Sequence, residues 1–405
     1  MGIIVQKYGG TSVAGPERIQ KVAARVCRAV DAGNQVVVVV SAQGDTTDQL
    51  LEMARAISPR PPKRELDMLL ATGEQISIAL LAMAIDALGY KVISLTGAQG
   101  GIMTDEHHTK AKIRKVNGER ITTELKRGAI VIVAGFQGVT ADNNITTLGR
   151  GGSDTTAVAV AAALQADICE IYTDVAGVYS ADPRMVPDAR LLPEVGYDEM
   201  LELASLGALI LQPRAVEVAA IYGVPLHVRS SFQDCPGTIV REVEDVEKAV
   251  SVTGVASDDN CAQITIIGVP QEVNTLQLVF ASLAEEGINV DMIVKASGRA
   301  ATTNLSFTVQ RSDLQSALEA IHHLPGAGQW EISANEDVAK VSIVGAGMMT
   351  NPGVAAAMFD VLAQEGVPVE LVTTSEIKVS CLVPRKRLKD AVSSCHRRFC
   401  LHEAK

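Results

Sequence analysis

The stretch with the clearest capacity for chemistry runs from Thr146 to Thr156 and reads Thr-Thr-Leu-Gly-Arg-Gly-Gly-Ser-Asp-Thr-Thr. Its three glycines let the backbone come close to a ligand, because no Cβ intervenes. The small apolar residues that follow predict a helix, whose N-terminal amides and dipole favour an anion. We expect Ser153 or Asp154 to cap that helix, while Arg150 offers a fork for a carboxylate or phosphate. The stretch predicts an anion-binding loop, with a plain structural turn as the alternative.

The elements around this loop alternate between apolar β-branched runs and helical patterns over the first 240 residues. Such strands, separated by helices, predict an α/β fold with a mainly parallel sheet covered on both faces. Ligands of such sheets bind at the carboxyl ends of the strands, and there the expected strands end in polar, glycine-rich residues. The expected strands are 3–5, 36–40, 91–95, 129–133, 168–172 and 225–228, and the expected helices are 16–31, 66–88, 155–164 and 197–222, the last broken near Leu206-Gly207.

Composition limits the class of protein. A chain of 405 residues with 47% apolar content predicts about two or three domains with substantial cores. A net charge of -11 argues against nucleic acid as the main partner. We expect no signal peptide and no membrane span, and hence a cytoplasmic protein. The seven cysteines follow no metal-ligand spacing, so no metal site is predicted.

The last 145 residues repeat themselves after a charged connector at 246–260. Residues 263–270 return as 340–347, residues 284–291 as 363–370, and residues 305–309 near 378–383. Each unit has the pattern strand, helix, strand, strand, helix, strand, which is typical of a ferredoxin-like βαββαβ domain. The pair predicts a regulatory or dimerising module.

Five motifs in this order resemble the aspartate kinase (aspartokinase) family over nearly the full chain. They are 7–13 (Lys-Tyr-Gly-Gly-Thr-Ser-Val), 41–48 (Ser-Ala-Gln-Gly-Asp-Thr-Thr-Asp), Thr72-Gly73-Glu74, the 149–154 loop, and 172–184. The resemblance implies an amino-acid kinase domain over 1–245, a linker at 246–260, and ACT domains at 261–337 and 338–405 that can exchange strands. It also implies ATP-dependent phosphorylation of the aspartate side chain, the first step towards lysine, threonine and methionine.

The expected reaction depends mainly on the stabilisation of negative charge. A carboxylate with a pKa of about 3.9 is already ionised at neutral pH, so no strong general base is needed. Phosphoryl transfer needs positioning and stabilisation of charge, with ATP and Mg²⁺ as the implied cofactors. Lys7 can follow the moving phosphoryl group, and Asp154, which resembles the family's catalytic aspartate, can orient Lys7.

The remaining site residues follow from the family positions. Glu74 can accept from the substrate ammonium group and Arg150 can hold its carboxylate. The expected substrate residues are Thr47, Glu74, Arg150, Gly151, Gly152 and Ser153. The expected ATP-binding residues are Lys7, Tyr8, Gly9, Gly10, Ser41, Thr173, Asp174, Tyr179 and Arg184. The expected effector residues are Asp291, Met292, Ile293, Thr374 and Ser375.

Some positions depart from the family pattern. Leu209 stands where a lysine usually reaches the nucleotide, so we expect either Arg214 or Arg184 to compensate or the enzyme to be slow. In the first ACT unit, Lys295-Ala296 replaces Gln-Asn and Asn304-Leu305 replaces Asp-Ile. These changes predict altered feedback control by lysine or threonine.

Other readings stay open. The chain could act on glutamate or an aspartate analogue, or serve as a weakly active amino-acid sensor. We expect at least a homodimer formed through the ACT units. No methionine lies between Met200 and Met292, so a separate ACT subunit made from an internal AUG start is not expected.

Overall fold

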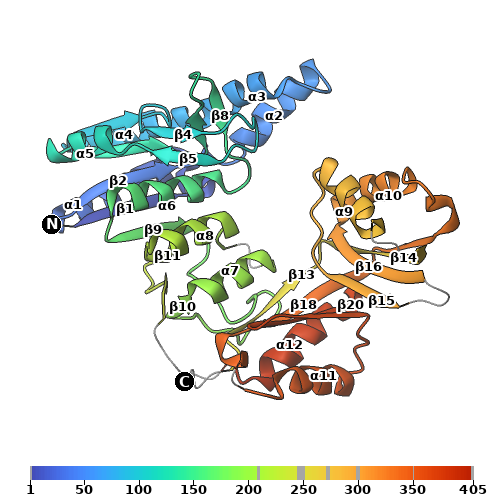
Figure 1. Ribbon diagram of the computed structural model, residues 1–405. Helices are drawn as coiled ribbons and strands as arrows, with labels where there is room; N and C mark the ends of the chain where they lie inside the picture. The colour runs from blue at the N-terminus through green and yellow to red at the C-terminus, as the bar shows by residue number, and fades with distance from the viewer. Residues whose placement is uncertain are drawn as a thin grey trace. The chain divides into compact units, whose positions relative to one another are not determined.

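The computed structural model describes residues 2–207, 210–243, 251–270, 274–297, 302–349 and 351–402. The chain divides into two compact units (Figure 1). The first comprises Met1–Val178, Leu191–Ser205 and Leu209–Glu244, and the second comprises Tyr179–Arg190, Leu206–Ala208 and Asp245–Lys405. Leu209 lies outside the described residues.

An eight-stranded sheet forms the centre of the first unit, in the order β10-β12-β11-β9-β1-β2-β6-β3. Every neighbouring pair is parallel except β11 with β12. The mainly parallel α/β sheet expected from the sequence is therefore confirmed. Its strands are β1 (Ile3–Tyr8), β2 (Gln35–Val40), β3 (Val92–Leu95), β6 (Ile130–Ala134), β9 (Ile168–Thr173), β10 (Glu194–Gly196), β11 (Leu226–Ser230) and β12 (Thr238–Arg241).

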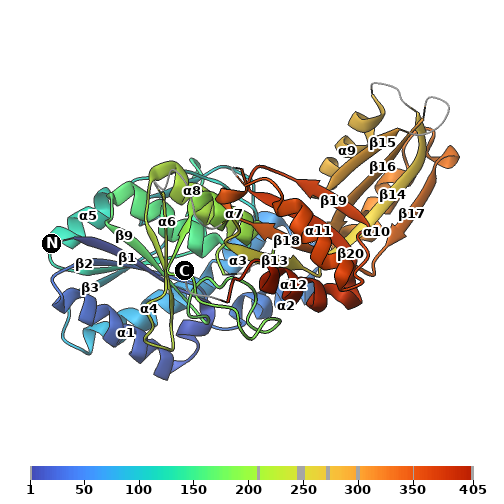
Figure 2. The ribbon, with the colours of Figure 1, turned by 90° about the horizontal axis from the view of Figure 1, so that it is seen from below.

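Helices cover both faces of this sheet, which explains why β2 and β6 are apolar almost throughout. Figure 2 shows α1 and α4 on one face and α5 and α6 on the other. The helices of this unit are α1 (Pro16–Asp31), α2 (Thr46–Ile57), α3 (Lys63–Leu70), α4 (Thr72–Asp86), α5 (Glu119–Lys126), α6 (Gly152–Leu164), α7 (Tyr197–Ser205) and α8 (Pro213–Tyr222).

The single helix expected over 66–88 is instead two helices, α3 and α4, which meet at Ala71. The backbone carbonyl of Ala71 accepts a hydrogen bond of 2.8 Å from the side chain of Gln137, which accompanies the break. Taken together, 63–86 is long and apolar enough to cross a membrane by composition. One such stretch is weak evidence of a membrane span, because the core helix of a globular protein passes the same test of length and composition.

A second, smaller sheet packs beside α3 in the same unit, in the order β5-β4-β7-β8. Its last strand, β8, leads directly into the glycine-rich loop and α6. The small sheet therefore fixes the position at which the glycine-rich loop begins. Its strands are β4 (Ile102–Thr104), β5 (Ile113–Val116), β7 (Gln137–Val139) and β8 (Ile145–Thr147).

The first repeat of the second unit has the expected βαββαβ order, with the sheet order β15-β16-β14-β17. Its helices pack on the sheet through a core that includes Val279, Leu283, Phe307 and Ile321. The elements are β14 (Cys261–Pro270), α9 (Thr275–Glu285), β15 (Ile293–Ser297), β16 (Thr302–Gln310), α10 (Leu314–His322) and β17 (Glu331–Asn335).

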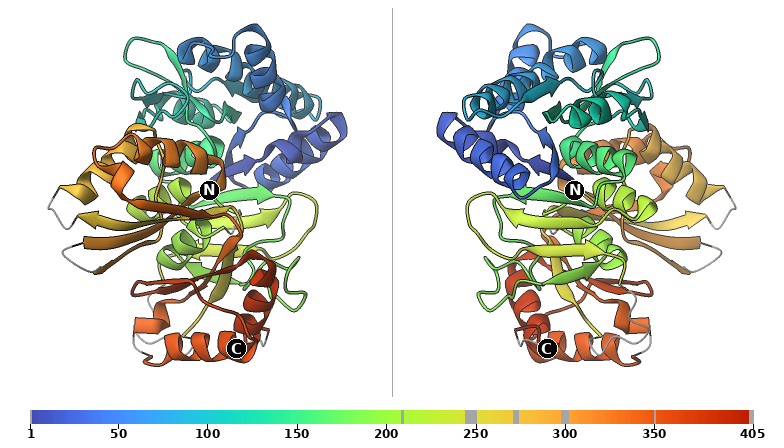
Figure 3. Two further views of the ribbon diagram at one scale, coloured as in Figure 1. Left: turned by 90° about the vertical axis from the view of Figure 1, so that its right-hand side faces the viewer. Right: turned by 90° about the vertical axis from the view of Figure 1, so that its left-hand side faces the viewer.

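The second repeat takes its fourth strand from outside its own sequence. Its sheet order is β13-β18-β20-β19, and β13 (Gly254–Asp258) precedes the first repeat and pairs antiparallel with β18. The stretch 246–260, expected as a linker, thus contains a strand of this sheet, while 338–402 supplies β18 (Val338–Val344), α11 (Val354–Gln364), β19 (Leu371–Thr374), β20 (Lys378–Pro384) and α12 (Leu388–Arg398). Figure 3 shows this repeat from two further sides.

The core of the second repeat also contains part of the 179–190 segment. Ala181 and Val186 pack with β13, α11 and α12. His396, which is 2% exposed on α12, places its Nε2 2.9 Å from the hydroxyl of Ser180. The same hydroxyl accepts a hydrogen bond of 3.0 Å from the backbone N–H of Arg190. Polar and apolar contacts together fix this segment to the core of the second repeat.

Candidate active site

The glycine-rich loop begins α6 with Gly151 at the N-cap, in the left-handed region at φ 71°. Neither Ser153 nor Asp154 makes a capping hydrogen bond, so that expectation is wrong: both residues lie inside the first helical turn. Gly152 has no room for a side chain, because an added Cβ would lie 2.9 Å from Cδ2 of Phe136. The glycines thus allow close packing, and both polar side chains of the first turn are buried.

The structure brings Lys7 and Asp154 into contact. Lys7 lies on β1, in the middle of the sheet, and its Nζ is 2.5 Å from Oδ1 of Asp154. Their side chains are 12% and 10% exposed. A buried ion pair of this kind is costly to desolvate and is weak evidence of stability alone. Its position at the carboxyl end of a parallel strand is where ligands of such folds bind.

Two glycines follow β1 beside this pair. A Cβ on Gly10 would lie 2.7 Å from the carbonyl oxygen of Ala42, so the turn after β1 packs directly on the turn after β2. Gly44 also donates a backbone hydrogen bond of 3.0 Å to Gly10. A Cβ on Gly9 would lie 3.6 Å from Nζ of Lys7. These two turns therefore form one backbone surface next to the ammonium group.

Tyr8, in contrast, turns away from this surface. Its side chain is completely buried and stacks on Tyr172 with ring centroids 4.7 Å apart. Burial raises the pKa of the Tyr8 hydroxyl well above its usual value. Its side chain thus belongs to the core, and a ligand could meet this residue through its backbone alone.

Glu74 joins the same region from the first turn of α4. It is 2% exposed, and its Oε1 accepts a hydrogen bond of 3.0 Å from the backbone N–H of Ala42. Its Oε2 is buried and has no hydrogen-bond partner among the described residues. Burial raises the pKa of this carboxyl to about 7. Since native proteins rarely leave a buried carboxylate oxygen unpaired, this atom points to an absent donor.

The other expected substrate residues surround this region less tightly. Ser153 is 7% exposed, and its Oγ would lie 2.7 Å from a Cβ placed on Gly135, at the end of β6. Thr47 is half-buried in the first turn of α2. Arg150 is exposed, and its guanidinium has no ion pair or hydrogen bond within the part of the chain that the structure describes.

The expected ATP-binding residues fall into both units. Ser41 follows β2 and donates its backbone N–H to the Tyr8 carbonyl at 3.1 Å, whereas Thr173 and Asp174 lie at the end of β9. Tyr179 and Arg184 belong to the second unit. The Arg184 guanidinium pairs with Asp182 at 2.7 Å. Lys7, Gly9, Gly10 and Ser41 therefore lie together in the first unit. Tyr179 and Arg184 lie in the second unit.

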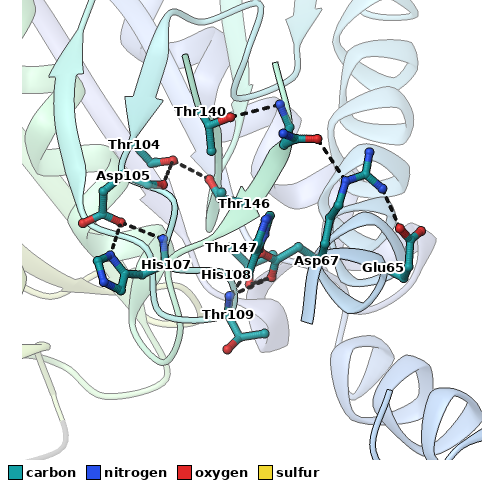
Figure 4. A network of polar contacts seen from close by, with 12 residues as sticks. Glu65, Asp67, Thr104, Asp105, His107, His108, Thr109, Thr140, Thr146 and Thr147 are labelled. Carbon is teal, nitrogen blue, oxygen red and sulfur yellow. Dashed lines mark hydrogen bonds and ion pairs between the residues drawn. The ribbon is translucent and has the colours of Figure 1, made fainter. Parts of the chain in front are cut away.

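Sequence reasoning missed Asp67 and named Arg214 only as a possible replacement for the lysine absent at Leu209, whereas both side chains anchor the loop. Arg214 donates hydrogen bonds to the carbonyls of Leu148 and Ala111 at 2.8 and 3.2 Å, so it holds the loop backbone. Asp67 is fully buried on α3 and binds the 105–112 turn and Thr147 (Figure 4). The available signal for Asp67 was a carboxylate between Leu66 and the apolar run Met68-Leu69-Leu70.

The expected effector residues lie in the second unit, where the two repeats share a small core containing Met292, Val338 and Leu371. Asp291 forms an ion pair with Lys340 of β18, and Ile293 is 48% exposed at the start of β15. Thr374 and Ser375 are exposed at the end of β19. Met292 is thus buried, whereas its neighbours face solvent.

Comparisons with known proteins follow the same division. The Amino acid kinase family matches residues 2–230, and the ACT domain matches 264–324 and 341–399. An aspartokinase of Geobacillus stearothermophilus is 52% identical over 403 residues, which cover 100% of this chain and 98% of the relative.

Solved structures agree in fold. Aspartokinase III of E. coli in complex with aspartate and ADP (R-state) has a TM-score of 0.81 at 24% identity, covering 98% of this chain and 99% of that one. The same enzyme in complex with lysine and aspartate (T-state) has a TM-score of 0.78, again at 24% identity, with the same coverage. On its full-length sequence identity to aspartokinases, the chain is an enzyme that belongs to the aspartokinase family.

Proposed function

We propose that this enzyme transfers a phosphoryl group from ATP to the side-chain carboxylate of L-aspartate, giving 4-phospho-L-aspartate. The observation that carries the proposal is the buried Lys7–Asp154 pair, with the unpaired Oε2 of Glu74 in the same region of turns. Membership of the aspartokinase family supports it. The product is the first intermediate towards lysine, threonine and methionine.

Lys7 stabilises the charge that develops on the transferred group. Its ammonium lies where a parallel α/β sheet receives its ligand, and its burial strengthens its field. Asp154 holds Lys7 in place through the 2.5 Å contact. Since the substrate carboxylate is already ionised at neutral pH, Asp154 has no proton to remove and acts by orienting charge.

The amino-acid end of the substrate is held by two opposite charges. The substrate ammonium group satisfies the buried Oε2 of Glu74, which lacks a partner among the described residues. The guanidinium of Arg150, which has no partner among the residues described, takes the α-carboxylate in a bidentate pair. Thr47 and Ser153 supply hydroxyl contacts, and the substrate meets Gly151 and Gly152 through their backbone.

We assign ATP to the backbone surface formed by Gly9, Gly10 and the turn after β2, because Gly10 lets these two turns pack directly on each other next to the Lys7 ammonium group. Ser41 follows β2, and Thr173 and Asp174 lie at the end of β9, the neighbour of β1 in the sheet. These three residues, like Tyr179 and Arg184, are assigned to the nucleotide by family position. Mg²⁺ supplies further neutralisation of phosphate charge when bound. The described residues hold no cluster of three acidic, histidine or cysteine side chains, which suits a Mg²⁺ bound largely by the phosphates.

Regulation is assigned to the ACT units, with lysine or threonine bound near Asp291, Met292, Ile293, Thr374 and Ser375. The family departures lie side by side, since Ala296 pairs with Asn304 and Lys295 with Leu305 across β15 and β16. An effector ammonium must also compete with Lys340 for Asp291. Both features support weakened feedback control.

We further propose a cytoplasmic enzyme that dimerises through these units.

The reaction is tested by trapping acyl phosphate as hydroxamate with ATP, Mg²⁺ and either aspartate, glutamate or an aspartate analogue. We expect the parent to prefer aspartate, and Asp154→Asn to lower kcat about a hundredfold or more while leaving the Kd for ATP within about threefold. Glu170→Gln removes another buried carboxylate of the sheet and serves as the control, with kcat nearly retained. Equal losses of turnover and ATP binding in Asp154→Asn would contradict the assigned role.

Glu74 predicts a pH dependence of aspartate binding. Because its pKa in the free enzyme is about 7, it is increasingly protonated below that pH and then no longer attracts the substrate ammonium. We expect kcat/KM for aspartate to fall as pH drops from 8 to 6, following that pKa. Glu74→Gln should lower kcat/KM at pH 8 by roughly tenfold to a hundredfold and flatten the profile. An unchanged profile in the variant would remove Glu74 from the clamp.

Feedback control is tested by titrating lysine and threonine, singly and together, against the same reaction. We expect weak or absent inhibition, because Lys340 already occupies Asp291 and the paired strand positions have changed. Lys340→Met frees Asp291 and should increase sensitivity. Strong inhibition of the parent at low effector concentration would overturn the proposal of altered control.

A further inference from the structure

Asp67 is a fully buried carboxylate on α3 that has no role in the reaction assigned above. Burying a carboxylate is costly unless its oxygens are hydrogen-bonded. Here Oδ1 accepts the Thr147 hydroxyl at 2.5 Å, and both oxygens lie 3.1 Å from the backbone N of Thr109. Nδ1 of His108 lies 2.6 Å from Oδ2. One side chain thus ties together a helix, a turn and the end of β8 (Figure 4).

The turn held by Asp67 has an unfavourable backbone conformation. Thr109 has φ 70°, a left-handed region that β-branched residues rarely adopt. Such conformations persist where surrounding contacts over-determine them, and they concentrate at functional sites. The carboxylate of Asp67 supplies that contact by accepting the N–H of Thr109 itself.

The constrained turn abuts the start of the glycine-rich loop. A Cβ on Gly149 would lie 3.1 Å from the carbonyl oxygen of Thr109, and Ala111 donates a backbone hydrogen bond of 3.0 Å to Thr147. Arg214 secures the next residue through the Leu148 carbonyl. The entry to the loop is therefore fixed by two buried or half-buried charged side chains, one on α3 and one on α8.

We propose that Asp67 is a positioning residue for the substrate: through Thr147 and the Thr109 turn, it sets the loop that presents Arg150 and Ser153 to aspartate. The proposal rests on the proposed function, because it assigns these two residues to the amino acid. Within the described part of the chain, the hydrogen-bond partners of Asp67 are His108, Thr109 and Thr147, and none of them belongs to the turns after β1 and β2. Loss of this anchor therefore affects aspartate far more than ATP.

Thr147→Val tests this by removing the hydroxyl that binds Asp67 while keeping the volume. Thr146 is the matched control: it is the neighbouring buried residue on β8, and its hydroxyl contacts Thr104 instead, at 2.6 Å. We expect Thr147→Val to raise the KM for aspartate roughly tenfold to a hundredfold, with the KM for ATP within about twofold. Thr146→Val should lower the melting temperature similarly but leave both KM values nearly unchanged. Thr147→Ser should restore the parent values.

Equal changes in the KM for aspartate in Thr147→Val and Thr146→Val, or failure of Thr147→Ser to restore it, would overturn the positioning role. His108→Ala provides a second variant, since His108 is 20% exposed and tolerates truncation more readily. It should raise the KM for aspartate by about threefold or more without changing that for ATP. An unchanged KM for aspartate would also overturn the proposal. A parent that does not phosphorylate aspartate would instead refute the proposed function.

Discussion

The constraint on which the candidate site of the first unit depends is a buried pair of opposite charges, Lys7 and Asp154. Each charge requires the other there, because removing one partner of a buried ion pair leaves the other charge desolvated and uncompensated, which is strongly destabilising. The fold meets this demand by placing Lys7 on the central strand β1 and Asp154 in the first turn of α6. The same arrangement yields a strong local field at the carboxyl end of β1.

The glycines serve that pair by bringing backbones close to it. Gly10 packs on the Ala42 carbonyl, and Gly152 packs on Phe136, so both turns approach more closely than side chains would allow. Glu74 completes the region with a carboxylate whose pKa is raised to about 7 and whose Oε2 lacks a partner in the described chain. Asp67 and Arg214 stabilise the start of the glycine-rich loop through their hydrogen bonds to Thr147 and Leu148. The site is thus held by contacts beyond the groups assigned to the substrates.

The sequence predicted what depends on local pattern. The apolar runs indicated the parallel sheet, the repeated segments indicated two ferredoxin-like units, and the motif around Lys7 indicated the first loop. Contacts between distant segments were not predictable: β13 joins β18 across more than 80 residues, and Asp67 meets Thr147 across 80. The cap was misplaced because Gly151, in the left-handed region, is the N-cap of α6, two or three residues earlier than Ser153 or Asp154 suggested.

The most direct test of this account is a double-mutant cycle on the turnover of aspartate and ATP, using Lys7→Met, Asp154→Asn and the double variant. If the two residues act as one buried pair, each single variant already leaves an unpaired group, and the double variant should lose little more than the worse single variant, within about tenfold. If the losses in kcat instead multiply, the two residues act independently, and the central claim is contradicted.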